Sequence, residues 1–150
     1  MAKIIVLFDS RGGNTRAAAE SVAEGARLVP GVEAELMEAG GLDMARLAAA
    51  GALAVGSPNY YTYMSGRIKT FFDLAFRQEA FKGKPFAAFS THGGGGGVAA
   101  IIEKLAKSVG LSRVTEGLDF LGAPAGDQLK QCRHLGQMLG RAATNAAESR

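Results

Sequence analysis

Near the start of the chain lies the stretch Ile4-Ile5-Val6-Leu7-Phe8-Asp9-Ser10-Arg11-Gly12-Gly13-Asn14-Thr15. Its first five residues form a continuous apolar run rich in β-branched side chains, as expected of a strand that is covered on both faces. The two glycines favour tight turns. After them, apolar residues at four-residue spacing predict a helix over 14–28. The stretch therefore predicts a strand, a loop and a helix in that order.

Other strands follow at intervals along the chain. Residues 32–36 alternate apolar and charged side chains, which predicts an edge strand with one face in water. Residues 52–56 and 85–90 are again continuously apolar and are expected to be central. A weaker fifth strand is expected over 115–121. The chain thus offers five candidate strands.

Helical patterns fill the intervals between these strands. Apolar residues at three- and four-residue spacing form two stripes, Ile68-Phe71-Phe72-Ala75-Phe76 and Val98-Ile101-Ile102-Leu105-Val109. A last helix is expected over 127–147. Alternating strands and helices predict an α/β fold, and we expect a doubly wound five-stranded parallel sheet of order 2-1-3-4-5 with helices on both faces. One domain covering residues 1–150 is expected.

Three unusual loops each follow one of the apolar runs expected to be central. They are Ser10-Arg11-Gly12-Gly13-Asn14-Thr15, Ser57-Pro58-Asn59-Tyr60-Tyr61-Thr62-Tyr63 and Thr91-His92-Gly93-Gly94-Gly95-Gly96-Gly97. In the predicted order, strands 1, 3 and 4 are neighbours. Ligands of such sheets bind beyond the carboxyl ends of the strands. We therefore expect the three loops to meet around one ligand.

Each loop suggests a different contact. Backbone amides, hydroxyl groups and a helix start in the first loop suit a phosphate, although a turn in which Asn14 or Thr15 only caps the helix is the alternative. The tyrosines of the second loop suit stacking on a flat ring, the alternative being a loop packed by its own aromatics. The glycine run would expose its backbone amides to the polar edge of a ring. The alternative is that it is only a flexible loop. Asp9 would repel a phosphate, so we expect it to face away, toward Arg11 or Arg16.

The composition excludes several classes of protein. Hydrophobic residues make up 47% and charged residues 21% of the chain, as in ordinary globular proteins. No apolar stretch is long enough for a membrane span, and no signal peptide is visible, so a cytoplasmic location is expected. The net charge of +3 is uneven, with the excess of basic residues in 67–150, but these residues are scattered over several predicted helices and form no dense run, which argues against nucleic-acid binding. The single cysteine, Cys132, is expected to be buried and inert, and no metal site is expected.

With these loops in place, the chain resembles the flavodoxin-like FMN-binding superfamily over essentially its whole length. Residues 10–15 are similar to the family's phosphate loop, with Gly12 where a hydroxyl residue is usual. Residues 56–60 and 64–73 look like the corresponding stretch of WrbA-type NAD(P)H:quinone oxidoreductases, and Thr91-His92-Gly93-Gly94 looks like their third flavin loop.

The resemblance implies FMN as cofactor. It implies that Ser10, Arg11, Gly13, Asn14 and Thr15 bind the phosphate, with Gly12 in the same loop. It implies that Pro58, Asn59, Tyr60 and Tyr61 line the isoalloxazine and that Thr91 through Gly94 hold its pyrimidine side. The candidate cofactor-binding set also includes Ser57, Tyr63 and Gly95, and no catalytic residue is assigned.

Two functions remain open at this point. The chain is either an FMN-dependent oxidoreductase that passes electrons from NAD(P)H to a quinone, flavin or other small acceptor, or an electron carrier that docks with redox partner proteins. The basic charge and the second loop favour the enzyme, whereas the small size and the lack of a nicotinamide motif favour the carrier. A non-redox binding module is a third interpretation, and a homo-oligomer is left open.

Overall fold

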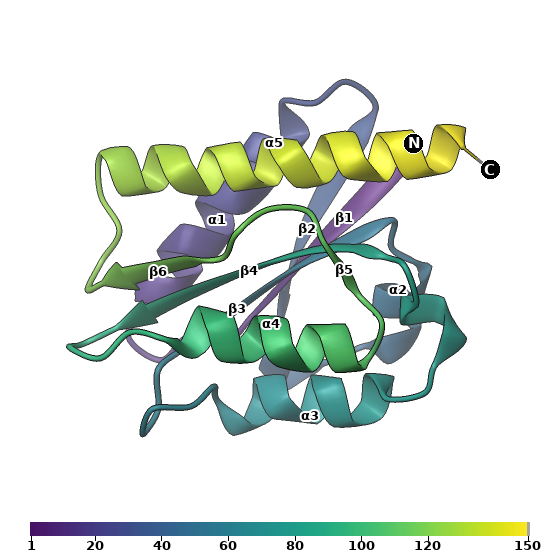
Figure 1. The fold of residues 1–150 in the computed structure, drawn as a ribbon. Coiled ribbons are helices and arrows are strands. Elements are labelled where there is room, and N and C mark those ends of the chain that lie inside the picture. Colours follow the sequence, from purple (N-terminus) through teal and green to yellow (C-terminus); the bar gives the residue numbers. More distant parts are fainter. Residues whose placement is uncertain (150) are drawn as a thin grey trace.

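The sheet has the order β2-β1-β3-β4-β5, and β6 pairs with β4 beside β5 (Figure 1). It is seen in a computed structural model that describes residues 1–149. The strands are β1 (Ala2–Phe8), β2 (Val32–Glu38), β3 (Ala52–Pro58), β4 (Pro85–His92), β5 (Ser112–Arg113) and β6 (Leu118–Leu121). All neighbouring strands pair in parallel. The predicted order 2-1-3-4-5 is confirmed, with β2 at an edge.

The fifth position of the sheet differs from the prediction. The strand expected over 115–121 is two short strands, β5 and β6, which pair with different parts of β4. Between them the amide of Gly117 donates to the Glu103 carboxylate at 3.1 Å instead of to a backbone carbonyl of β4. The register against β4 shifts by two residues between the Phe86–Arg113 and Phe89–Leu118 pairs, so the strand is interrupted there.

Helices cover both faces of the sheet. Helices α1 (Asn14–Arg27) and α5 (Asp127–Glu148) lie on one face, while α2 (Met44–Ala49), α3 (Gly66–Ala75) and α4 (Val98–Ser108) lie on the other (Figure 1). Two single 3₁₀ turns, Ala39–Gly41 and Glu79–Phe81, complete the regular structure. The sequence did not predict α2, because six residues are too few to establish a helical period. None of the helices in the described residues is long and apolar enough to cross a membrane.

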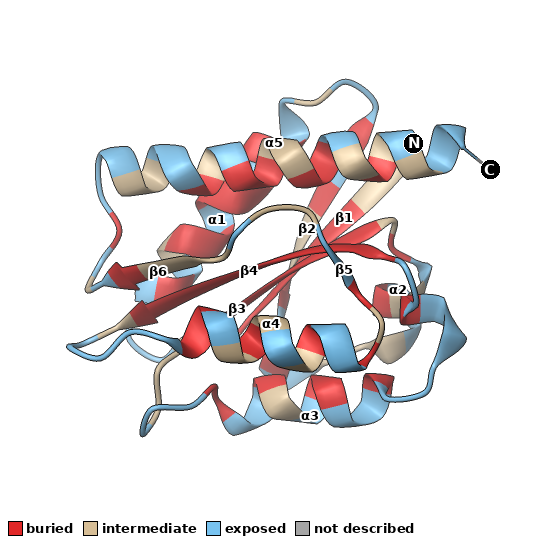
Figure 2. Ribbon diagram, viewed as in Figure 1, coloured by how far each residue is buried: buried red, intermediate tan, exposed pale blue. Residues whose placement is uncertain are grey.

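The apolar runs are continuous because both faces of each central strand are buried. In β1, Ile4, Val6 and Phe8 pack under α1 and α5, whereas Ile5 and Leu7 pack under the helices of the opposite face. The buried residues accordingly gather along the central strands (Figure 2). This double coverage places the carboxyl ends of β1, β3 and β4 side by side.

Cys132 lies in the core between α1, α5 and the sheet. Burial raises the pKa of its thiol to about 12, so the nucleophilic thiolate is scarce at neutral pH. We expect Cys132 of the folded protein to be unreactive toward a disulfide reagent at pH 8 and to react within minutes in denaturant. Release of thionitrobenzoate measures this, and stoichiometric release without denaturant would contradict the burial.

Candidate functional site

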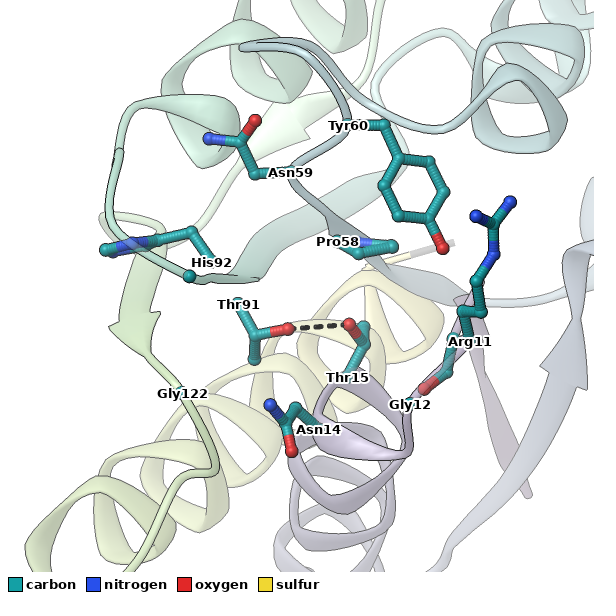
Figure 3. A pocket seen from close by; sticks show the side chains of 12 residues that line it. Arg11, Gly12, Asn14, Thr15, Pro58, Asn59, Tyr60, Thr91, His92 and Gly122 are labelled. Carbon is teal, nitrogen blue, oxygen red and sulfur yellow. Dashed lines mark hydrogen bonds between the residues drawn. The ribbon is translucent and has the colours of Figure 1, made fainter.

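The three loops converge on an open cleft of about 500 Å³ at the carboxyl ends of β1, β3 and β4 (Figure 3). The residues that line it come from the first loop, the second loop, the third loop and the end of β6. They are Ser10, Arg11, Gly12, Asn14, Thr15, Pro58, Asn59, Tyr60, Thr91, His92, Gly93 and Gly122.

The first loop is folded around the hydroxyl of Ser10. The Ser10 Oγ accepts hydrogen bonds from the amides of Gly13 and Arg16, at 3.1 and 3.3 Å. Gly13 precedes α1 with a φ of +97°, a conformation that favours glycine. Neither Asn14 nor Thr15 caps the helix through its side chain. The helix-cap interpretation of these two residues is therefore wrong.

Donors remain available in this loop. The amides of Asn14 and Thr15 open α1, where an α-helix offers no internal acceptor. Within residues 1–149 neither of these amides donates to another group. Two free amides at the positive end of a helix suit an anion.

Thr15 also joins the first loop to the third. Its Oγ1 lies 2.8 Å from the Oγ1 of Thr91, and both side chains are buried (dashed line in Figure 3). This hydrogen bond ties the start of α1 to the end of β4 at the cleft.

The charged neighbours of the first loop pair differently from the prediction. Arg16 forms an ion pair with Glu38, and Asp9 faces Arg67 at 3.9 Å instead of Arg11 or Arg16. The expected partners of Asp9 were wrong, because they were sought only within the loop. Asp9 does lie outside the lining of the cleft. Arg11 stands over the ring of Tyr60, 4.8 Å from its centre.

The second loop is a tight hairpin. The backbones of Tyr60 and Tyr63 exchange two hydrogen bonds, at 2.8 and 3.1 Å, and the residues between them, Tyr61 and Thr62, both have positive φ. Positive φ at both central positions is typical of a type I′ turn. The turn places Tyr61 at the tip with its side chain fully exposed, and Tyr63 is 38% exposed. Of the three tyrosines, only Tyr60 lines the cleft.

Two further residues hold this hairpin in position. The Oγ of the buried Ser57 accepts from the amide of Ser65 at 2.9 Å and donates to the carbonyl of Pro58 at 2.8 Å. Asn59 Oδ1 accepts from the amide of Thr62, and its Nδ2 donates to the carbonyl of Gly95. Ser57 thus lies behind the cleft, while Asn59 ties the second loop to the glycine run.

The third loop contributes His92 and Gly93 to the cleft, whereas Gly94 and Gly95 lie outside the lining. The Nδ1 of His92 is buried and has no hydrogen-bond partner within residues 1–149. A buried polar atom without a partner is costly, so this nitrogen is suited to receive a ligand.

Sequence reasoning missed two residues around the third loop. Asp119 Oδ2 accepts from the amides of Gly97 and Ala99 and so caps α4. Gly122 lines the cleft, and its amide donates to the carbonyl of His92 at 2.8 Å. The signal for Gly122 was present, because a glycine follows the fifth strand at the same edge of the sheet.

The residues of the cleft fit FMN. The start of α1 offers free amides, which suit a phosphate, with the charged Arg11 in the same loop, and the second and third loops offer the Tyr60 ring and a polar edge at His92.

Comparisons with known proteins point the same way. A family model described as NADPH-dependent FMN reductase matches residues 43–117. A flavodoxin of Aquifex aeolicus (strain VF5) is 41% identical over 99 residues, which are 65% of this chain and 54% of that protein. The chain therefore spans about half the length of this relative.

Solved structures match over nearly the whole chain. A flavodoxin from the domain Archaea superposes with a TM-score of 0.86 at 27% identity, covering 95% of this chain and 99% of that one. The flavodiiron protein of Giardia intestinalis gives a TM-score of 0.88, also at 27% identity, over 98% of this chain and 37% of that chain.

Proposed function

We propose that this chain, which belongs to the NADPH-dependent FMN reductase family within the flavodoxin-like FMN-binding superfamily, is an FMN-dependent oxidoreductase. It would oxidise NAD(P)H and reduce a quinone, a flavin or another small acceptor. The cofactor is FMN and the protein is a redox protein. The observation that carries the enzymatic proposal is the family match over residues 43–117, which includes the whole second loop.

The cofactor is proposed to lie across the cleft. Its phosphate would be held by the amides and side chains of Asn14 and Thr15 and by the guanidinium of Arg11. Its ring would be flanked by Pro58, Asn59 and Tyr60, with Thr91, His92 and Gly93 along its polar edge. Gly13, Ser57 and Gly95, the last through its hydrogen bond with Asn59, would act by holding the loops in shape.

When bound, FMN supplies the electron chemistry, since its ring accepts a hydride or single electrons and passes them on. The chain's own residues bind and orient it. The open side of the cleft leaves room for a second reactant beside Tyr60, as electron exchange requires.

The electron carrier remains the second candidate. It is favoured by the archaeal flavodoxin, whose chain this one matches end to end. A carrier would dock with redox partner proteins and would not oxidise NAD(P)H by itself. The non-redox module proposed from the sequence loses its support, because the relatives indicate FMN binding. A homo-oligomer, a cytoplasmic location and one domain over 1–150 stay predictions.

The two candidates differ in a simple assay. FMN-loaded protein is mixed with NADPH or NADH and benzoquinone, and nucleotide oxidation is followed at 340 nm. The oxidoreductase is expected to turn over many times per protein and to depend on the acceptor. Absence of acceptor-dependent turnover with either nucleotide would overturn the enzymatic proposal and leave the carrier. Free FMN without protein serves as the control.

A further inference from the structure

A second cavity, open to solvent, lies beside the FMN cleft. Its walls include Asp9, Arg11, Tyr60, Gly66, Arg67 and Thr70. Arg11 and Tyr60 line both spaces, so the pair stacked at 4.8 Å is the partition between them. In Figure 3 the Arg11 side chain stands next to the Tyr60 ring, on the side away from His92. A molecule in the second cavity would therefore be a direct neighbour of one in the cleft.

The side chains of Arg11 and Arg67 in this cavity have N–H groups that donate no hydrogen bond to a described residue. A guanidinium carries five N–H donors. Among residues 1–149, neither Arg11 nor Arg67 donates a hydrogen bond through its side chain. Arg11 has only its stacking contact with Tyr60, and Arg67 has only the 3.9 Å ion pair with Asp9. Such a pair of under-used guanidinium groups suits a phosphate, which accepts bidentate hydrogen bonds.

The start of α3 adds backbone donors to the same space. Ser65 caps this ten-residue helix by accepting from the amide of Ile68. The amides of Gly66 and Arg67 come before the first intrahelical bond and donate to no group in the described residues. Their residues line the cavity, where they add the positive end of the helix dipole.

The charges of the walls favour an anion. Arg11 and Arg67 carry two positive charges against the one negative charge of Asp9. The Asp9 carboxylate is only 14% exposed and lies at the outer limit of an ion pair, so it positions Arg67 without using up its donors. The Thr70 hydroxyl already donates to the carbonyl of Gly66. The FMN phosphate proposed above would take some of the five donors of Arg11, so the donors left open are those of Arg67, the other donors of Arg11 and the start of α3.

We propose that this cavity is a second anion subsite, which holds a phosphate group of the molecule that exchanges electrons with the bound FMN. This inference rests on the proposed function, because it assigns the reactant of that function. The phosphate could belong to a nicotinamide nucleotide donor or to a free phosphorylated flavin acceptor. Both the donor and the acceptor would present a phosphate group to Arg67, and kinetics with different substrates distinguish the two.

The test uses Arg67→Gln, with Arg141→Gln as the matched control. Arg141 is exposed on α5, away from the cavity, so its replacement removes the same charge. Adenosine 2′,5′-bisphosphate, which has phosphates but no redox ring, is titrated calorimetrically into FMN-loaded and FMN-free protein. Arg67→Gln is expected to weaken its binding at least tenfold and to leave the FMN dissociation constant unchanged. Arg141→Gln is expected to change neither.

Steady-state kinetics then identify the source of the phosphate. If the donor supplies it, Arg67→Gln raises the KM for NADPH about tenfold and leaves the KM for a free flavin acceptor unchanged. If the acceptor supplies it, the KM for free FMN rises while that for riboflavin does not. In both cases kcat is preserved.

Two results separate this inference from the proposed function. Equal binding of the bisphosphate to the unchanged protein and Arg67→Gln, or equal weakening by Arg141→Gln, would overturn the subsite even in an active FMN reductase. Arg67-dependent binding to a protein that shows no nucleotide oxidation would support an anion subsite and overturn the proposed enzyme.

Discussion

An Asn14→Ala/Thr15→Ala variant is expected to bind FMN about 5- to 150-fold more weakly than the unchanged protein. The change removes one or two hydrogen bonds to a charged phosphate, worth about 1–3 kcal/mol together. Asn14 and Thr15 line the cleft at the start of α1. Quenching of flavin fluorescence during titration measures the dissociation constant.

Riboflavin makes this experiment specific, because it has the same ring without the phosphate. Its affinity should change little in the double variant, so the preference for FMN over riboflavin should collapse. A Thr144→Ala/Asn145→Ala variant on α5 is the matched control, because it removes the same two kinds of side chain outside the lining of the cleft. An unchanged FMN affinity in the Asn14→Ala/Thr15→Ala variant would show that the phosphate binds elsewhere.

Replacing Gly136 with alanine is expected to lower the free energy of unfolding by about 3 kcal/mol, the upper end for an overpacked core. A Cβ at this position would lie 1.9 Å from the backbone carbonyl oxygen of Val22 on α1. Backbone cannot move aside as a flexible side chain can, so α1 and α5 must separate. The gain in helix propensity, about 1 kcal/mol, offsets only part of the loss.

Alanine substitutions at three glycines with different amounts of space around them test whether the backbone contact causes the loss of stability. A Cβ on Gly140 would meet the Val29 side chain at 2.9 Å, so Gly140→Ala should cost less than Gly136→Ala. A Cβ on Gly66 would meet nothing within 4 Å, so Gly66→Ala should leave stability nearly unchanged. Denaturant unfolding followed by circular dichroism ranks the three. Equal stability of the Gly136 and Gly66 variants would contradict the close packing of α1 on α5.

The strand order was predictable because its signals are local. The continuous apolar runs of β1, β3 and β4 and the alternation in β2 each show how many faces are buried, and the topology follows from that. The Gly136 contact was not predictable, because nothing within α5 indicates how closely α1 approaches. Helix α2 was not predicted because it is short. The fifth strand is divided where its register against β4 shifts by two residues, which depends on pairing with a strand that is distant in the sequence.

The candidate site was predictable in outline. The convergence of the three loops follows from the neighbouring positions of β1, β3 and β4. The roles of individual side chains depend on backbone conformation, which the residue types leave open. Tyr61 and Tyr60 are adjacent and chemically alike, yet the positive φ of Tyr61 places it at an exposed tip. Likewise Asp9 pairs with Arg67, which the chain brings close only through α3.

The hydrogen bond between Thr15 and Thr91 has a directional consequence. A hydroxyl has a single proton, so only one of the two threonines donates to the other. A phosphate that accepts the proton of Thr15 would oblige Thr91 to become the donor within the pair. Thr91 would then present only lone pairs to the rest of the cleft and would favour a ligand N–H there. A phosphate bound at Thr15 would thus determine whether Thr91 donates or accepts a hydrogen bond from the rest of the ligand.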